Sequence, residues 1–300
     1  MKKIAVNNNA PLIILNPVSG PGNEKDREKA ITKVAKDLGW NGHLVTTTLN
    51  RTAADIAKHA IKNGTNHLVV CGGDGTIGEV VGVCVDKKII IGIVPLGTGN
   101  LFAQNLGIPL AITASMKIAL YGKRNKIDIG RANKIYFTVL AGIGFDAEMM
   151  KGAQRELKNK IGVFAYILTA VQSILRSSLI YQVQIDNRQP ITVRAKTILV
   201  ANLGKIQGGI MAVPQTSANN GRLSIGIIQA KNWYYWISLL VHALSGNINK
   251  SSSYKLLKGS NIVITLTGKK RAFECDGNIF PPTKKLTIEI LPRALSILTP

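Results

Sequence analysis

Three segments in the first hundred residues join a short apolar run to a turn rich in glycine. They are residues 12–20 (LIILNPVSG), 69–76 (VVCGGDGT) and 93–100 (IVPLGTGN). Short apolar runs bounded by turn signals are typical of buried strands. Glycine lets backbone amides face a concave turn, and a helix that follows adds its positive end, so such a turn can hold a phosphate. One such turn is as often only a tight connection, but three at successive strand ends point to a phosphate site.

The first 120 residues alternate apolar runs with amphipathic stretches. Strands are predicted at 12–15, 43–46, 68–70 and 89–94, and helices at 24–38, 53–63 and 78–85. Alternation of strand and helix favours parallel strands joined by crossover helices. Ligands of open sheets of this kind bind at the carboxyl ends of the strands, where the three glycine turns lie.

After Asp128 the pattern changes, because strand-like runs follow one another directly. They lie at 136–141, 181–185, 192–201, 223–228, 261–267 and 286–291, with turn residues between them. Two helices, 161–176 and 233–244, interrupt the series. This half is expected to be an antiparallel sandwich or barrel, so the chain is read as two domains with a boundary near 128.

The charge of the chain is strongly positive, with 38 Lys and Arg against 16 Asp and Glu, a net charge of +22. Such a field attracts nucleic acid, anionic lipid headgroups or phosphorylated small molecules. No helix-turn-helix, zinc-finger or RNA-binding aromatic pattern is present, so an anionic membrane surface is favoured over nucleic acid.

The cellular context follows from cysteines and apolar runs. Three cysteines stand far apart without a CxxC pair, which favours a reducing compartment without structural disulfides or zinc. No signal peptide and no apolar run of membrane-spanning length is recognised. We therefore expect a cytoplasmic protein whose membrane contact is peripheral.

The motifs together resemble the catalytic domain of diacylglycerol kinases, and more closely the soluble bacterial lipid kinases related to sphingosine kinases. The resemblance spans nearly the whole chain, and neither a Walker lysine pattern nor a GxGxxG fingerprint competes with it. It rests on NPVSG at 16–20, GGDGT at 72–76 with Glu79, PLGTGN at 95–100, DIG at 128–130, GIGFDA at 142–147, GGIMAVP at 208–214 and CDG at 275–277.

The resemblance implies an α/β protein with two domains. A Rossmann-like parallel-sheet domain of the NAD kinase and diacylglycerol kinase type would comprise residues 1–128 and 293–300, the last strand returning to it. An all-β sandwich that binds the lipid substrate would comprise 129–292. ATP would bind in the cleft between them, and its γ-phosphoryl group would pass to a lipid hydroxyl.

Site residues also follow from the resemblance. Asp74 would organise Mg²⁺ through water, and Asp276 would take the proton of the acceptor hydroxyl, in agreement with the modest chemical demands of phosphoryl transfer. The residues implied to line the nucleotide are Asn16, Pro17, Val18, Ser19, Gly20, Thr47, Gly72, Gly73, Asp74, Gly75, Thr76, Ile77, Gly78, Glu79, Thr98 and Asn100.

Several positions depart from the family pattern. Leu101 replaces an acid that many members use in the Mg²⁺ network, and Asn278 replaces the glutamate of a DGE motif. Asn220 stands where a structural metal site usually has aspartate, and it is only a weak metal candidate. These changes keep open a catalytically weakened homologue that binds nucleotide and membrane. A soluble-metabolite kinase of the NAD kinase superfamily, which shares the GGDG turn, is disfavoured.

The lipid side of the reaction leaves more alternatives. Residues 233–236 (WYYW) beside Lys231 fit an interfacial aromatic anchor, although aromatics at helical spacing more often mark a helix packed on the sandwich. Diacylglycerol, a sphingoid base, another glycerolipid and a prenol are all compatible acceptors. The oligomeric state stays open, a homodimer included.

Overall fold

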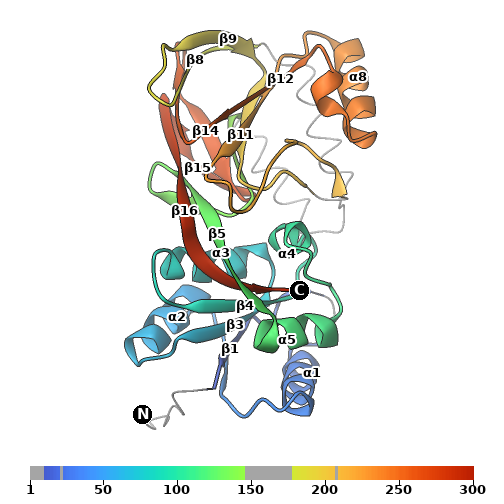
Figure 1. Cartoon of the computed structure of the whole chain (residues 1–300), viewed down its shortest axis with the longest axis vertical. Coiled ribbons are helices and arrows are strands. Elements are labelled where there is room, and N and C mark those ends of the chain that lie inside the picture. The colour runs from blue at the N-terminus through green and yellow to red at the C-terminus, as the bar shows by residue number, and fades with distance from the viewer. Residues whose placement is uncertain (1–9, 21–22, 146–177, 207–208) are drawn as a thin grey trace. The chain divides into compact units, whose positions relative to one another are not determined.

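The computed structural model describes residues 10–20, 23–145, 178–206 and 209–300 (Figure 1). Contacts divide the chain into two compact units, Met1–Ile127 with Arg293–Pro300, and Asp128–Pro292. The assignment of nucleotide binding to the first unit and lipid binding to the second stays a prediction.

The first unit is built on a parallel sheet in the strand order β2-β1-β3-β4-β16. Strand β16 joins β4 through Ser296 and Ile297. The elements of this part of the chain are β1 (Leu12–Leu15), α1 (Glu24–Asp37), β2 (Leu44–Thr46), α2 (Ala53–Lys62), β3 (His67–Gly72), α3 (Asp74–Cys84), β4 (Ile90–Pro95), α4 (Leu101–Asn105), α5 (Ile112–Tyr121), β5 (Lys123–Ala132) and β16 (Lys285–Thr299).

Helices cover both faces of this sheet (Figure 1). On one face, α1 and α5 contribute Ile31 and Met116 to a buried cluster with Ile13 and Val69 of the strands. Helices α2 and α3 pack against each other and against the strands on the other face. A sheet buried on both faces explains why its strands read as continuous apolar runs.

Helix α3 begins four residues earlier than the sequence predicted. It starts at Asp74 after the extended N-cap Gly73, and the Ile77 amide donates to the Gly73 carbonyl. Gly75, which the prediction left in the turn, lies inside the helix because the apolar face of α3, with Ile77 and Val80 buried, packs on the sheet.

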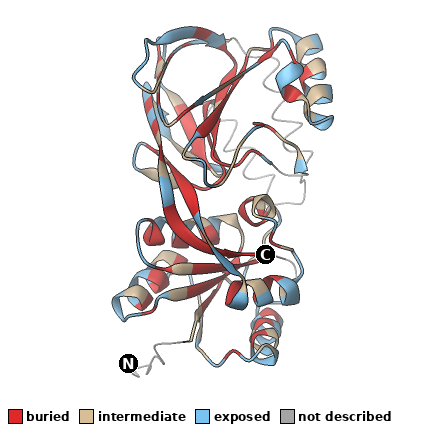
Figure 2. Ribbon diagram, in the orientation of Figure 1, coloured by how far each residue is buried: buried red, intermediate tan, exposed pale blue. Residues whose placement is uncertain are grey.

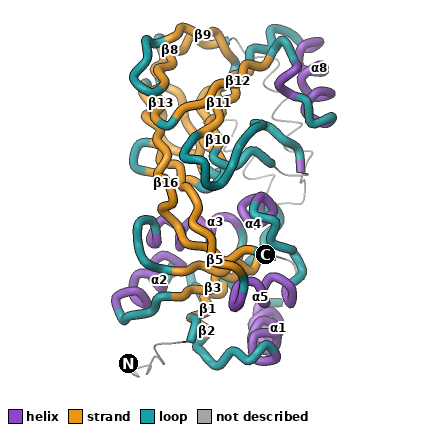
Figure 3. Tube along the Cα trace, viewed as in Figure 1, coloured by secondary structure: helices purple, strands orange, loops and turns teal. Residues whose placement is uncertain are grey.

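The second unit is an antiparallel β sandwich (Figure 3). One sheet continues from β16 in the order β16-β13-β8-β9, with β5 also paired to β16 and to β6, and the other has the order β12-β11-β10-β7-β14-β15. Its further elements are β6 (Ile135–Phe137), β7 (Leu140–Phe145), β8 (Leu179–Ile185), β9 (Ile191–Ala195), β10 (Thr197–Ala201), β11 (Leu223–Ile228), α8 (Trp233–Leu244), the 3₁₀ helix η2 (Ile248–Lys250), β12 (Tyr254–Gly259), β13 (Asn261–Leu266), β14 (Arg271–Cys275) and β15 (Asn278–Thr283).

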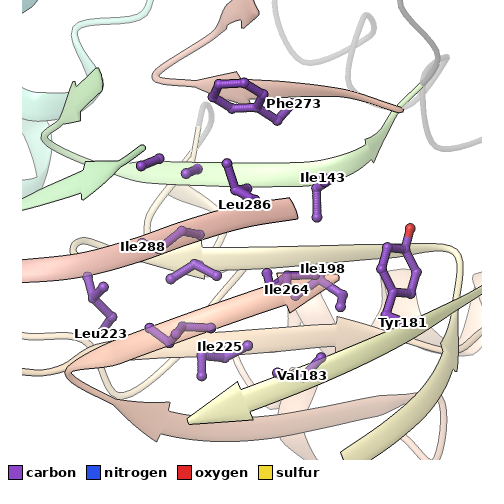
Figure 4. Close-up of a cluster of buried hydrophobic side chains, with 14 of the residues drawn as sticks. Ile143, Tyr181, Val183, Ile198, Leu223, Ile225, Ile264, Phe273, Leu286 and Ile288 are labelled. Atoms are coloured by element: carbon purple, nitrogen blue, oxygen red, sulfur yellow. The ribbon is translucent and has the colours of Figure 1, made fainter. Parts of the chain in front are cut away.

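The core of the sandwich lies between its two sheets, as Figure 4 shows. Val183, Ile264 and Leu286 from one sheet meet Ile198 and Ile225 from the other, and all five side chains are fully buried or nearly so. Buried and more exposed residues alternate along β8, β9 and β13, because only one face of their sheet enters this core. The predicted fold class, a parallel α/β domain followed by a β sandwich, is confirmed.

Four predicted strands have different bounds in the structure. The run 136–141 is divided into β6 and β7, and the run 192–201 is divided at Lys196, where the chain leaves β8 for the pairing partners β7 and β11. The two predicted strands near the C-terminus are one strand, β16, which bends where Arg293 adopts a φ of 54°. Tertiary pairing sets these bounds, and the apolar pattern alone does not contain it.

Other elements were not predicted at all. Helix α5, strand β5 and strand β12 were overlooked, as was the hairpin of β14 and β15. The predicted helix 161–176, and part of the GIGFDA and GGIMAVP motifs, lie outside the described residues. Within the described ranges, no helix is both long enough and apolar enough to span a bilayer.

Candidate functional site

The glycine turns after β1, β3 and β4 converge in the first unit. Gly20 adopts a φ of 85°, and a Cβ on it would stand 2.2 Å from the Leu96 carbonyl oxygen. A Cβ on Gly97 would stand 2.7 Å from the Gly73 Cα. The three backbones therefore touch at positions where any side chain would force them apart. The predicted turns form one cluster, as the parallel topology requires.

Asn16 connects the first turn to helix α3. Its Nδ2 donates to Thr76 Oγ1 at 2.8 Å, and its backbone amide donates to the Cys71 carbonyl at 2.9 Å. Its side-chain oxygen accepts from the Val18 amide, and the Ser19 amide donates to its carbonyl. The turn is thus closed around Asn16, and these two amides are engaged within it. The nucleotide contacts predicted for this turn stay predictions.

Arg27 is a residue of this region that the sequence reading missed. It is only 9% exposed on α1, and its guanidinium donates to the carbonyls of Pro17 and Gly20. These hydrogen bonds hold the turn against α1 and bring the positive charge of Arg27 close to it. Nothing in the sequence distinguishes this arginine from the other charged residues of α1.

Asp74 joins the second turn to the third. Its Oδ1 accepts from the Phe102 amide at 3.2 Å, at the start of α4, and its Oδ2 lies where a Cβ on Gly99 would approach to 2.9 Å. Burial raises the pKa of the Asp74 carboxyl, while backbone hydrogen bonds from Leu101 and Phe102 act in the opposite direction. Leu101, the departure from the family pattern, takes part through its backbone.

The first turn of α3 provides the amides suited to an anion. The amides of Asp74, Gly75 and Thr76 lie ahead of the first intrahelical hydrogen bond, from Ile77 to Gly73, so helix geometry gives them no acceptor inside the helix. They lie at the positive end of the helix. This is the part of the GGDGT motif able to bind a phosphate.

The third turn is shaped by Asn100. Its side chain accepts from the Gly97 amide at 2.9 Å and donates to the Gly97 carbonyl at 2.6 Å, and its backbone adopts a φ of 49°. Asn100 is 4% exposed, so its side chain holds the turn rather than reaching outward. Thr98, at the tip of the turn, is exposed.

A pocket of about 410 Å³ lies beside the first turn. Glu79 Oε2 accepts from the amides of Ala53 and Ala54 and so caps the N-terminus of α2, where Thr52 forms a capping box with Asp55. The pocket lining joins predicted and unpredicted residues, namely Asn16, Pro17, Val18, Thr47, Thr76 and Glu79 with Glu24, Thr48, Leu49, Thr52 and Ala53.

One predicted nucleotide contact, Ile77, disagrees with its burial in the structure. The Ile77 side chain is 1% exposed in the core and its amide donates to Gly73, so it presents no group to a ligand. Gly78 lies within α3 with open space around its Cβ position, so its predicted nucleotide contact stays a prediction.

Asp276 lies in the second unit, in the two-residue turn between β14 and β15. Its Oδ2 accepts from the amide and hydroxyl of Thr138 at 2.6 and 2.8 Å, and its Oδ1 accepts from the amides of Val139 and Leu140 at 2.9 and 3.1 Å. These contacts hold the backbone at the break between β6 and β7. Burial raises the pKa of the Asp276 carboxyl, against the effect of these hydrogen bonds.

Glu274, two residues earlier, is a second buried carboxyl that the sequence reading missed. It is 9% exposed on β14, while its neighbours Phe273 and Cys275 point into the sandwich core. Burial, and then the negative charge of Asp276, raise the pKa of the Glu274 carboxyl to about 8. A carboxyl group that keeps its proton near neutral pH is typical of functional sites but also occurs in purely structural ones.

Asn220 occupies a tight turn that is held from both sides. Its side-chain oxygen accepts from the Arg222 amide at 3.0 Å, and the Gly221 amide donates to Asp128 Oδ2 at 2.7 Å. Among the described residues no group of three His, Cys, Asp or Glu side chains could hold a metal ion. A metal at Asn220 therefore stays a prediction without support from a ligand cluster.

Known proteins resemble the chain along nearly its full length. Residues 10–132 match the family described as "Diacylglycerol kinase catalytic domain", and residues 139–299 match "YegS C-terminal NAD kinase beta sandwich-like domain". "Uncharacterized protein sll0036" of Synechocystis is 30% identical over 96% of this chain and 70% of its own length. "Diacylglycerol kinase" of Bacillus subtilis is 28% identical over 86% of each chain.

A solved structure agrees in fold. The crystal structure of a diacylglycerol kinase from Bacillus anthracis superposes with a TM-score of 0.77 at 22% identity and covers 99% of both chains. The two family matches meet close to the boundary between the two units and together cover both. The resemblance seen in the motifs is thereby confirmed, and the chain belongs to the diacylglycerol kinase catalytic-domain family.

Proposed function

We propose that this protein is an ATP-dependent lipid kinase that transfers the γ-phosphoryl group of ATP to a lipid hydroxyl. The observation that carries the proposal is the contact among the three strand-end turns, which sets the N-terminal amides of α3 close to a pocket large enough for a nucleoside. Phosphoryl transfer depends mainly on positioning and on neutralisation of charge, and converging turns are suited to both.

The nucleoside and the phosphates fit different parts of this region. The pocket contains the carboxylates Glu24 and Glu79, which repel phosphate but accept hydrogen bonds from ribose hydroxyls. At its rim Val18 is 68% exposed and Leu49 fully exposed, as surfaces for an adenine ring would be. The phosphates would then lie toward the amides of Asp74, Gly75 and Thr76.

The residues fit a magnesium ion that arrives with ATP. Mg²⁺ usually keeps several waters and takes one or two protein carboxylates together with substrate phosphates. Asp74 offers one carboxylate beside the α3 amides, and the part of the chain that the structure describes holds no cluster of three ligating side chains. Asp74 would hold the ion through water, and the ion would neutralise phosphate charge.

Asp276 is the proposed acceptor of the hydroxyl proton. In the transfer, the lipid oxygen forms a bond to the γ-phosphorus, the bond to ADP breaks, and the hydroxyl proton goes to the carboxylate. Burial raises the pKa of Asp276, which favours proton uptake. Its four hydrogen bonds oppose that uptake and fix the carboxylate in place.

A homologue with weakened turnover is the second candidate. It is favoured by the same four hydrogen bonds, which engage both oxygens of Asp276, and by the neutral Asn278 next to the turn. This candidate binds ATP and membranes but transfers phosphate slowly. It predicts that Asn278→Glu, which adds a second acid, increases transfer.

The experiment that tests the proposal combines radiolabelled ATP, Mg²⁺ and a panel of lipids in mixed micelles. We expect labelled lipid with the wild type and at least about a hundredfold less with Asp74→Asn, because that variant loses the carboxylate nearest the phosphates. Thermal stabilisation by ATP is measured in parallel. Stabilisation without labelled lipid supports the second candidate, and the absence of both contradicts nucleotide chemistry altogether.

The position of the nucleoside is tested by a matched pair of substitutions. Leu49→Ser alters the pocket rim, while Leu110→Ser alters another exposed leucine of the same unit that is 53% exposed and outside the pocket. We expect Leu49→Ser to weaken ADP binding about three- to tenfold and Leu110→Ser to leave it unchanged. Equal affinities would place the base elsewhere.

A further inference from the structure

Helix α8 has two apolar faces, and the described residues of the sandwich cover one of them. Tyr235, Trp236, Leu239 and Ala243 pack against a small cluster that includes Ile228, Ile248 and Tyr254. The helix is therefore anchored on the sandwich, as the alternative sequence interpretation predicted. Its opposite face, however, is not polar.

Six large apolar side chains of α8 are exposed. In Figure 2 parts of this helix have the pale blue of exposed residues. Their exposed fractions run from 41% for Leu240 to 64% for Tyr234 and Leu244. With 3.6 residues per turn, their spacing places them along one side of the helix. We call this set the α8 apolar face, and it consists of Trp233, Tyr234, Ile237, Leu240, Val241 and Leu244.

This grouping is unusual for a water-exposed helix. An isolated exposed leucine needs no explanation, but a contiguous apolar patch on one element marks a surface that contacts something other than water. An aromatic pair at one end, Trp233 and Tyr234, is typical of helices that lie at a membrane interface, because their rings suit the headgroup region.

The charge around α8 indicates which partner it meets. Residues 187–273 contain no Asp or Glu, but carry five Lys and Arg between 187 and 222 and seven between 223 and 273. Lys231 precedes the helix by two positions, and Lys250 ends η2, which packs against it; both are exposed. A helix with an apolar face, flanked in the chain by basic residues and by no acidic ones, complements an anionic bilayer.

We propose that the α8 apolar face is a docking surface for an anionic lipid bilayer. Trp233, Ile237 and Leu244 enter the headgroup boundary, and the flanking lysines bind lipid phosphates. The inference rests on the proposed lipid kinase function, because it identifies the membrane that such a kinase would bind. The binding itself needs neither ATP nor transfer, so the two can fail separately.

Vesicle binding without ATP tests the proposal, with phosphatidic acid as the anionic lipid in phosphatidylcholine. Phosphatidic acid lacks a free alcohol, so binding is measured apart from any acceptor role. We expect the full chain to co-sediment with these vesicles, and to bind pure phosphatidylcholine and high-salt samples about tenfold more weakly.

A matched pair of double variants assigns the surface. Ile237→Gln with Leu244→Gln removes two residues of the α8 apolar face, and Ile180→Gln with Ile191→Gln changes two exposed isoleucines of β8 and β9 in the same unit. We expect the first pair to weaken vesicle binding by about tenfold and the second by less than about twofold. Equal behaviour of the two pairs overturns the proposal.

A measurement on the otherwise unchanged chain guards against misfolded variants. Of the three tryptophans, Trp233 is 63% exposed, Trp40 is 6% exposed and Trp236 packs on the sandwich, so brominated lipid should quench mainly Trp233. We expect quenching that Trp233→Phe largely removes. If quenching persists in that variant, the α8 apolar face is not a membrane surface. The same conclusion follows if Ile237→Gln with Leu244→Gln converts a dimer into a monomer in light scattering while vesicle binding is unchanged.

Discussion

Gly73 and Gly97 are in direct backbone contact. A Cβ on Gly97 would stand 2.7 Å from the Gly73 Cα, and a Cβ on Gly73 would stand 3.3 Å from the Gly97 Cα. Gly73 is the N-cap of α3, and Gly97 opens the turn that leads to α4. The position of Asp74 relative to the α4 amides therefore depends on the absence of two side chains.

Gly97→Ala should lower the free energy of unfolding by about 1–3 kcal/mol, because the added methyl meets backbone that cannot rotate away. It should also reduce thermal stabilisation by ATP, since the turns move apart. Chemical denaturation with and without ATP measures both effects.

The control for Gly97 is Gly78→Ala, a glycine inside α3 with nothing within 4 Å of an added Cβ. Alanine favours a helix interior over glycine, so this variant should be about 0.5–1 kcal/mol more stable than the wild type. A Gly97→Ala protein as stable as the Gly78→Ala protein would show that the turns do not touch.

Asp276→Asn should destabilise the second unit as well as reduce transfer. Asparagine keeps only one acceptor oxygen, and its NH₂ group would face amides that also donate, so we expect a loss of about 2–4 kcal/mol. Asn278→Asp, at the exposed end of the same hairpin, should change the free energy of unfolding by less than about 0.5 kcal/mol. Urea denaturation compares them, and an Asp276→Asn protein of wild-type stability would refute the structural role.

Glu274 should make the protein less stable as the pH rises toward 8. Its folded pKa is about 8 and its reference value 4.5, so between these values the folded state keeps a proton that the unfolded state releases. The free energy of unfolding then falls with increasing pH, by at most about 1.4 kcal/mol per unit, and levels off above the folded pKa.

Glu274→Gln tests this dependence because glutamine does not titrate. Denaturation at several pH values between 5 and 9 should show a flatter profile for the variant, and a greater stability than the wild type at the alkaline end. Profiles of equal slope would show that Glu274 is ionised in the folded protein.

Much of the architecture could be predicted from local pattern. The apolar runs at β1, β4 and β11 and the periodic stretches at α1, α2 and α8 lie within one or two residues of their predicted bounds. Such elements are specified by side chains close together in sequence, through buried faces and capping residues such as Thr52. The motif order was specific enough to identify the family.

The errors occur where distant residues decide the outcome. Asp276 lies 138 positions after Thr138 and accepts a hydrogen bond from its amide. This contact divides the predicted strand 136–141 into β6 and β7. Packing of Ile77 and Val80 on the sheet starts α3 at Asp74, although two glycines there suggest a turn. In the sequence Arg27 resembles the other charged residues of α1. Only the fold brings its guanidinium to the Pro17 carbonyl.

The sequence by itself determined the kind of elements, their order and the glycines at three strand ends, because these depend on periodicity and on backbone freedom within a few residues. The tertiary structure alone decided which amides remain available, which carboxyls are buried and which face of α8 is exposed. These properties depend on contacts between residues far apart in the chain, and burial changes the free energy of a charge or an apolar surface only once those contacts exist.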